Sequence, residues 1–276
     1  MKAVVIKHAF FIALTFIFIS SQAFCGIILE KLHTYQIAPN EIEKEKSISY
    51  FQDNMIKTVQ EDGSYVIVDL NKGKFFFVDP KEKKYMENSL DDMAQQVQKS
   101  MKEFKSQLEG LPAEQRAIIE KMMGMGVTKT KKAKPVLKAT GQTMKIAGIK
   151  AEKYVIEKQG KIIGEYWVSK ELKNKLAKEL DPSKISKFEK AMEKLSAQMD
   201  FWGSSSASKV IELEEKIREK GEIVKEIKYT DYMNTKSKDQ EELISIKEEK
   251  LPKSIFEIPK NYKKSKMFDG EISFGK

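Results

Sequence analysis

The sequence predicts an α+β protein in which helices cover one face of a continuous antiparallel sheet. Two groups of short, closely spaced strand patterns occur at 27–87 and 135–169. Each group is followed by stretches in which apolar residues recur at spacings of three and four, the pattern of amphipathic helices. No linker longer than the serine-rich segment at 201–208 separates these groups. We therefore expect one domain rather than two.

The first strand group has the pattern of an antiparallel meander. Asp53-Asn54 is a turn signal, and Asp62-Gly63 is the strongest short hairpin signal in the chain. Alternating or continuous apolar residues between the turns predict strands at Ile27–Ile37, Ser47–Gln52, Met55–Gln60, Tyr65–Leu70, Phe75–Asp79 and Lys84–Glu87.

Two helices are expected next. Ser89, with Asp92 three residues later, resembles a capping box at a helix start. Apolar residues then follow at helical spacing as far as Leu108, and Gly110 and Pro112 end the pattern. Residues 113–123 form a second, shorter apolar-periodic stretch.

The second half of the chain repeats this order. Strands are expected at Val136–Ile146, Ile149–Glu157 and Lys161–Ser169, and helices at Lys170–Glu179, from Asp181-Pro182 onward, and at Lys209–Lys220. Strands at Glu222–Tyr232 and Glu241–Glu248 and the tail Phe256–Tyr262 close the predicted domain.

The N-terminus has the pattern of a secretory signal peptide. A basic start is followed by the apolar stretch Ala9–Ile19 and the small-x-small pattern Ser21-Gln22-Ala23. About 20 apolar residues are needed to span a bilayer, and this stretch has about eleven. We expect removal of 1–23, a periplasmic domain at 24–276, and no transmembrane span in the mature chain.

Cys25 is the only cysteine, so a disulfide within one chain is excluded. Its place after the signal leaves open a lipid-modified N-terminus, although the bulky Phe24 precedes it where lipoprotein processing requires a small residue.

The formal net charge of +9 comes almost entirely from lysine, since Arg116 and Arg218 are the only arginines. Nucleic-acid recognition favours the planar fork of arginine. We therefore expect no nucleic-acid partner; the charge suits anionic head groups or an acidic partner.

Catalytic and metal-binding patterns are missing from the sequence. His33 and Cys25 are the only histidine and cysteine after residue 23, which excludes a site built from several such ligands. The sequence has no G-x-S-x-G motif and no glycine-rich phosphate loop. We expect no enzyme, no cofactor and no metal, and we interpret His33 as a strand or surface histidine.

The predicted helices carry many of the methionines. Methionine is flexible and polarisable, so it suits surfaces that accept varied apolar partners. Two interpretations stay open: core filling beneath the sheet, and an adaptable groove for an acyl chain. The residues are Met93, Met101, Met122, Met123, Met125, Met192 and Met199.

Three segments resemble a known exported family. They are the meander containing IVDLNKGKFFFVDPKEKKYME, the stretch TGQTMKIAGIKAEKYVIEKQGKIIGEYWVSKEL at Thr140–Leu172, and FEIPKNY at Phe256–Tyr262. Together they resemble an uncharacterised bacterial family (domain of unknown function 4412), which is similar in turn to the LolA/LolB-type lipoprotein carriers. The resemblance implies a strongly curved, unclosed half-barrel of antiparallel strands around helices, with a concave apolar surface that accepts acyl chains.

We therefore expect a non-catalytic envelope protein that binds an apolar ligand such as a lipid or a lipoprotein acyl chain. The alternative is a structural module that contacts another envelope protein and holds no small ligand. A one-residue register error would turn any strand residue to the opposite face. The candidate lining residues are Phe75, Phe77, Met93, Val97, Met101, Trp167 and Met192.

Overall fold

A computed structural model describes residues 26–38, 41–122, 134–199, 207–232 and 235–265. The predicted signal peptide, Cys25 and most of the serine-rich segment lie outside these ranges. Within them, no helix is both long and apolar enough to cross a bilayer.

The described residues form one 12-stranded sheet, which confirms the predicted continuous sheet. The order across the sheet is β12-β6-β5-β4-β3-β2-β1-β11-β10-β9-β8-β7, and every pair is antiparallel except β12 with β6. The strands are β1 (Gly26–Ala38), β2 (Glu41–Gln52), β3 (Met55–Gln60), β4 (Tyr65–Asp69), β5 (Lys74–Asp79), β6 (Lys84–Ser89), β7 (Val136–Ile146), β8 (Ile149–Lys158), β9 (Lys161–Ser169), β10 (Glu222–Tyr232), β11 (Thr235–Glu249) and β12 (Lys263–Lys264).

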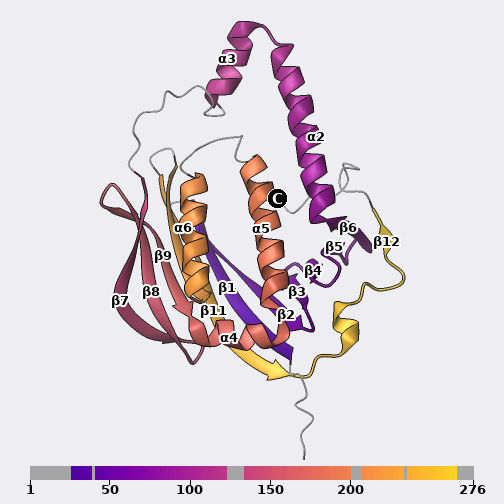
Figure 1. Cartoon of the computed structure of the whole chain (residues 1–276), viewed down its shortest axis with the longest axis vertical. Helices are drawn as coiled ribbons and strands as arrows, with labels where there is room; N and C mark the ends of the chain where they lie inside the picture. The colour runs from indigo at the N-terminus through magenta and orange to yellow at the C-terminus, as the bar shows by residue number, and fades with distance from the viewer. Residues whose placement is uncertain (1–25, 39–40, 123–133, 200–206, 233–234, 266–276) are drawn as a thin grey trace, which may run out of the picture.

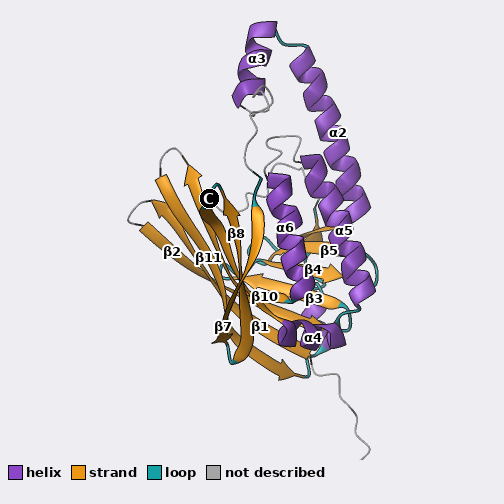
Figure 2. Ribbon diagram, turned by 60° about the vertical axis from the view of Figure 1, so that its left-hand side comes forward, coloured by secondary structure: helices purple, strands orange, loops and turns teal. Residues whose placement is uncertain are grey.

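The sheet curves around the helices without closing into a barrel, as Figures 1 and 2 show. This confirms the unclosed half-barrel. The helices are α2 (Leu90–Glu109), α3 (Ala113–Met122), α4 (Lys170–Glu179), α5 (Pro182–Met199), α6 (Ala207–Lys220) and the short 3₁₀ helix η2 (Lys253–Phe256).

Local sequence explains where α2 begins. The hydroxyl of Ser89 accepts the backbone N–H of Asp92, and the Asp92 carboxylate accepts the backbone N–H of Ser89. This capping box satisfies two N–H groups that lack a helical partner. From this start, α2 contacts β6 and α5 and continues upward to α3, which lies beyond the sheet (Figure 1).

Helix α4 lies at the lower end of the sheet (Figure 1) and contacts β1, β2, β8 and β10. Leu172 and Leu176 of this helix pack with Ile27, Leu29 and Val224. The turn between β2 and β3 is fixed to the end of α4, because the backbone N–H of Asn54 donates to the Glu179 carbonyl oxygen at 2.8 Å. Asp53 and Asn54 both have positive φ (53° and 64°), the backbone of a tight hairpin turn.

Two strands begin well before the position that the sequence predicts. β2 begins at Glu41 rather than Ser47, and β11 begins at Thr235 rather than Glu241. Residues 41–46 are exposed and mostly charged, so they show no apolar alternation. Their strand structure comes from pairing with the second half of β1, which no local pattern reveals.

Candidate ligand-binding site

One face of the sheet packs against α6, and we call it the helix-side face. Tyr166 of β9 marks it, because its ring is buried against Leu213 and Ile217 of α6. Direct partners in antiparallel strands place their side chains on the same face. The register then assigns a row across five strands to this face: Tyr166, Glu226, Glu241, His33 and Glu45.

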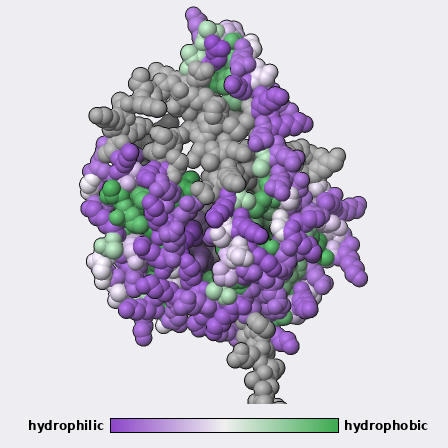
Figure 3. Space-filling model, viewed as in Figure 1, coloured by the Kyte–Doolittle hydropathy of each residue, from purple (hydrophilic) through white to green (hydrophobic). Residues whose placement is uncertain are grey.

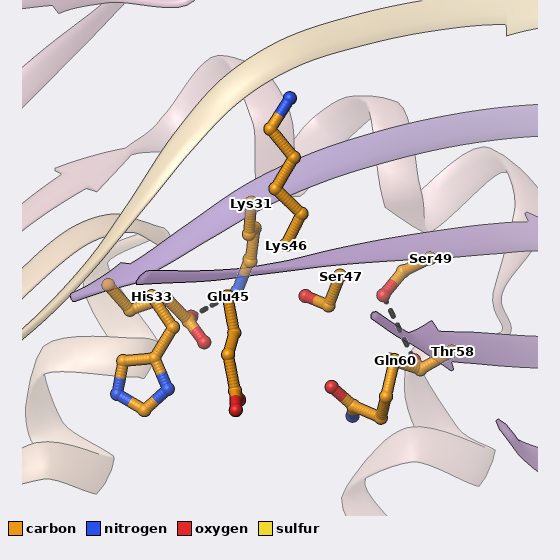
Figure 4. A pocket seen from close by; sticks show the side chains of 9 residues that line it. Lys31, His33, Glu45, Lys46, Ser47, Ser49, Thr58 and Gln60 are labelled. Carbon is orange, nitrogen blue, oxygen red and sulfur yellow. Dashed lines mark hydrogen bonds and ion pairs between the residues drawn. The ribbon is translucent and has the colours of Figure 1, made fainter. Parts of the chain in front are cut away.

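A pocket with a volume of about 290 Å³ lies over β1, β2, β3 and β11. We call it the polar hollow. Figure 4 shows His33, Glu45 and Gln60 pointing to one side of the sheet and Lys46 to the other. Hydroxyl, amide and charged groups dominate its lining, which consists of Lys31, His33, Glu45, Lys46, Ser47, Ser49, Thr58, Gln60 and Glu241.

Each basic side chain at the polar hollow has a carboxylate partner. Lys31 Nζ lies 2.7 Å from Glu241 Oε1, and His33 Nε2 lies 2.5 Å from Asp239 Oδ1. Lys46 Nζ lies 3.2 Å from Glu30, on the face away from α6. No positive charge that lines the hollow is therefore without a partner.

Two carboxylates converge on a single hydroxyl beside the hollow. Tyr35 Oη lies 2.8 Å from Glu43 Oε2 and 2.7 Å from Glu45 Oε1. The hydrogen bonds to Glu45 and Glu43 raise the pKa of Tyr35, because ionisation would bring three negative charges together. One phenolic proton serves one acceptor fully, so the other carboxylate keeps unused acceptor capacity.

Lys31 also acts on the carboxyl of Glu222, which does not belong to the lining of the hollow. Burial raises the pKa of the Glu222 carboxyl at the start of β10, while Lys31 and Arg218 act in the opposite direction. Lys31 therefore interacts with both Glu241 and Glu222. Because its raised pKa favours the neutral carboxyl, Glu222 does not add a full negative charge beside Lys31.

An apolar patch adjoins the polar hollow on the same face. The register continues from Ser49 through Thr58 to Val66, Phe77 and Met86. Val68 and Phe75 belong to the neighbouring row, and Phe75 meets Phe77 edge-on at 5.5 Å between ring centroids. We define the apolar patch as Val66, Val68, Phe75, Phe77 and Met86.

Two residues of the apolar patch are buried, and Val66, Val68 and Phe77 are half-buried. Phe75 and Met86 are 4% and 2% exposed. In the view of Figure 3, hydrophobic surface shows between α5 and α2, and hydrophilic surface covers α6. Helix α2 contacts β6, the strand of Met86, and packs against α5.

The structure brings some of the predicted lining residues together. Phe75 and Phe77 lie in the apolar patch, and Met93 is half-buried in the first turns of α2, the helix that contacts β6. Val97 and Met101 belong to the same helix, but their side chains lie outside the described part. Met192 lies on α5, which packs against α2, and is 40% exposed.

Trp167 is not brought together with them. It follows Tyr166 on β9, so alternation turns it to the face away from α6. There Lys153 Nζ lies 5.5 Å from its ring centroid, and Lys153 also pairs with Glu165 at 2.6 Å. Trp167 is also partly buried, because it packs against the apolar cluster that contains Ile27, Leu29 and Leu172 of α4.

The residues of the polar hollow were not expected from the sequence as a site. Glu241 belongs to a run of charged residues, and His33 is a single histidine in a strand. Only pairing between strands about 200 positions apart places them side by side. Among the described residues, no three His, Cys, Asp or Glu side chains lie close enough together to hold a metal ion.

No family model matches the chain, and no curated protein matches it. Among solved structures, PNGF-II is similar at 10% identity and a TM-score of 0.34 over 88% of this chain; the chain spans only 31% of that protein. A LolA superfamily protein from Nitrosomonas europaea shares 6% identity at a TM-score of 0.28, over 85% of this chain and 90% of that one.

An outer membrane lipoprotein-sorting protein domain from Vibrio parahaemolyticus shares 8% identity at a TM-score of 0.29, again over 85% and 90%. All these TM-scores are below 0.5, so the similarities assign no function to the chain. The resemblance to the domain of unknown function 4412 stays a prediction.

Proposed function

We propose that the chain is a non-catalytic periplasmic protein, exported by its signal peptide, that binds an amphiphile such as a lipid or an acylated molecule. The apolar tail lies against the apolar patch beneath α2 and α5. The polar head lies in the polar hollow. Binding buries apolar surface and forms hydrogen bonds, with no covalent step.

One observation carries this proposal: a polar and an apolar lining adjoin on one face of neighbouring strands. Ser49 and Thr58, whose hydroxyls lie 2.9 Å apart, line the hollow, and Val66 is the next residue in the same row. Neighbouring strands are about 4.8 Å apart, so the change occurs within the length of a few bonds. An amphiphile has the same abrupt change between head and tail.

Burial energetics favour a tail in the apolar patch over a wholly polar ligand. Each methylene group removed from water contributes about 0.8 kcal/mol. A chain of several methylenes that lies against Phe77 and its neighbours can thus contribute several kcal/mol. The methionines of α2 and α5 suit such a tail, because their side chains adapt to varied apolar shapes.

Native mass spectrometry of the chain, purified from an envelope fraction without detergent, tests this proposal. We expect a mass excess that organic extraction removes and that proves to be an amphiphile. Phe77→Asp should abolish the excess, whereas Phe76→Asp lies on the opposite face and serves as a matched control if both variants remain folded. A clean unliganded mass, unchanged after incubation with lipid vesicles, would overturn the proposal.

A specific observation also favours the alternative of a protein-contacting module. Helices α2 and α3 extend beyond the sheet (Figure 2), and Ile118 of α3 is 59% exposed. Ile118→Asp would weaken a protein contact there without changing amphiphile binding at the sheet. Co-purification of an envelope protein by the unchanged chain, lost in that variant, would support this function.

A further inference from the structure

We infer that the polar hollow selects a protonated amine as the head group of its ligand. This inference rests on the proposed function and assigns the head-group class that the function leaves open. The shared chemistry is an ammonium group, whether it belongs to a lipid head such as ethanolamine or to a free amine.

Acceptors predominate in the lining of the hollow. Glu45 and Glu241 contribute carboxylates, and Ser47, Ser49 and Thr58 contribute hydroxyl oxygens. An ammonium group has three donors and no acceptor, so it matches such a lining. The hydroxyl of Ser47 and the side-chain amide of Gln60 have no hydrogen-bond partner among the described residues, which leaves their oxygens open to a ligand.

The basic side chains of the hollow are already paired. Lys31 is held by Glu241 and His33 by Asp239. An anionic head would have to compete with these carboxylates and would meet Glu45. In the neutral imidazole, an Nε2–H that donates to Asp239 leaves Nδ1 as one more acceptor.

Two carboxylates on one side of the hollow, Glu43 and Glu45, have no basic partner among the described residues. They share the single proton of Tyr35. A bound cation would relieve this excess of negative charge.

Three amphiphiles with the same dodecyl tail distinguish the contribution of the head group to affinity from that of the tail. They are dodecylamine, dodecanol and dodecanoate. Their dissociation constants are measured with the full-length folded chain by titration calorimetry below micelle-forming concentrations. We expect dodecylamine to bind about tenfold more tightly than dodecanol, and dodecanoate most weakly, since a charged hydrogen bond contributes more than a neutral one. Propylamine, which has no tail, distinguishes a free amine from a lipid head.

Glu45→Gln removes one charge and keeps the shape of the side chain. We expect it to lower the preference for dodecylamine over dodecanol by about tenfold and to leave dodecanol binding unchanged. Glu82→Gln, on the exposed turn between β5 and β6, is the matched control and should change neither value. Tyr35→Phe leaves both carboxylates without the phenolic donor and should raise the preference for the amine.

The outcomes separate the two proposals. Equal binding of the three heads, or a preference for dodecanoate, would overturn amine selection and leave amphiphile binding intact. No binding of any dodecyl probe, together with binding of propylamine, would overturn the amphiphile and keep amine recognition. No binding of any probe would overturn both.

Discussion

Thr58 of β3 and Val66 of β4 are direct cross-strand partners, and the polar hollow gives way to the apolar patch between them. Both side chains lie on the helix-side face, and their shapes are nearly the same. The boundary between a polar and an apolar lining therefore depends on one hydroxyl group. Head and tail of a bound amphiphile would meet at this pair.

Moving this boundary should change tail binding. Val66→Thr adds a hydroxyl to the apolar patch, and we expect it to weaken binding of a dodecyl probe by about tenfold, because a hydroxyl buried without a partner costs about 1–3 kcal/mol. Thr58→Val, the matched change on the other side of the boundary, should strengthen tail binding. Calorimetric titration measures both. Unchanged affinities in two folded variants would place the tail elsewhere.

Removing the partner of Lys31 should reverse the preference for the head group. Glu241→Gln keeps the size of the side chain but takes away the charge that lies 2.7 Å from Lys31. We expect dodecanoate to bind more tightly to this variant than to the unchanged chain, and dodecylamine less tightly. The double variant Glu241→Gln, Lys31→Met should lose this increase in affinity for dodecanoate. If Glu241→Gln changes the affinities for dodecanoate and dodecylamine alike, the Lys31–Glu241 pair does not contact the head group.

The carboxyl of Glu179 should make stability depend on pH. Burial, with Asp53 nearby, raises its pKa in the folded chain, and its Oε2 atom has no hydrogen-bond partner. Between the unfolded pKa of about 4.3 and the raised folded value, the folded chain binds more protons than the unfolded chain. Stability therefore falls as the pH rises through this window, and the full penalty remains above it.

Glu179→Gln removes this penalty while keeping an oxygen for the Asp53 N–H. We expect a higher midpoint of thermal unfolding at pH 7, and a difference from the unchanged chain that shrinks as the pH falls below 4. Thermal unfolding followed by circular dichroism across this pH range measures it. A difference that stays constant with pH would show that titration of Glu179 is not the cause.

The buried side-chain amide of Asn88 should destabilise the fold. It is 7% exposed beside Phe75 on the helix-side face, and its Nδ2 atom has no partner. We expect Asn88→Leu to raise the free energy of unfolding by about 1 kcal/mol, because it removes an unpaired buried donor and keeps a branched side chain. Urea unfolding measures the change. A loss of stability in both Asn88→Leu and Asn88→Ala would indicate that the amide has a partner in solution.

Local patterns predicted most of the fold. The turn Asp53-Asn54, the capping pair Ser89 and Asp92, and the strand Lys161–Ser169 stand where the sequence placed them. These features depend on neighbouring residues, so a short window of sequence contains their cause. No local pattern predicts the charged start of β2, because only pairing with β1 makes it a strand.

The polar hollow could not be predicted in the same way. Lys31 and Glu241 are 210 positions apart, and they meet because β1 lies between β2 and β11 in the sheet. Nothing near either residue specifies that order. The shared face of Phe75 and Phe77 could be predicted from the sequence, since alternation along one strand places both side chains on the same side. The face on which Trp167 lies depended instead on the register of β9 with β10.

Photo-crosslinking with two dodecylamine probes tests the central claim most directly. One probe carries a diazirine at the end of the tail and the other carries it next to the amine. The account predicts that the tail probe labels peptides of β4–β6 or α2, and that the head probe labels peptides of β1–β3. Reversed labelling, or equal labelling of both regions by both probes, would contradict an amphiphile held across the boundary between Thr58 and Val66.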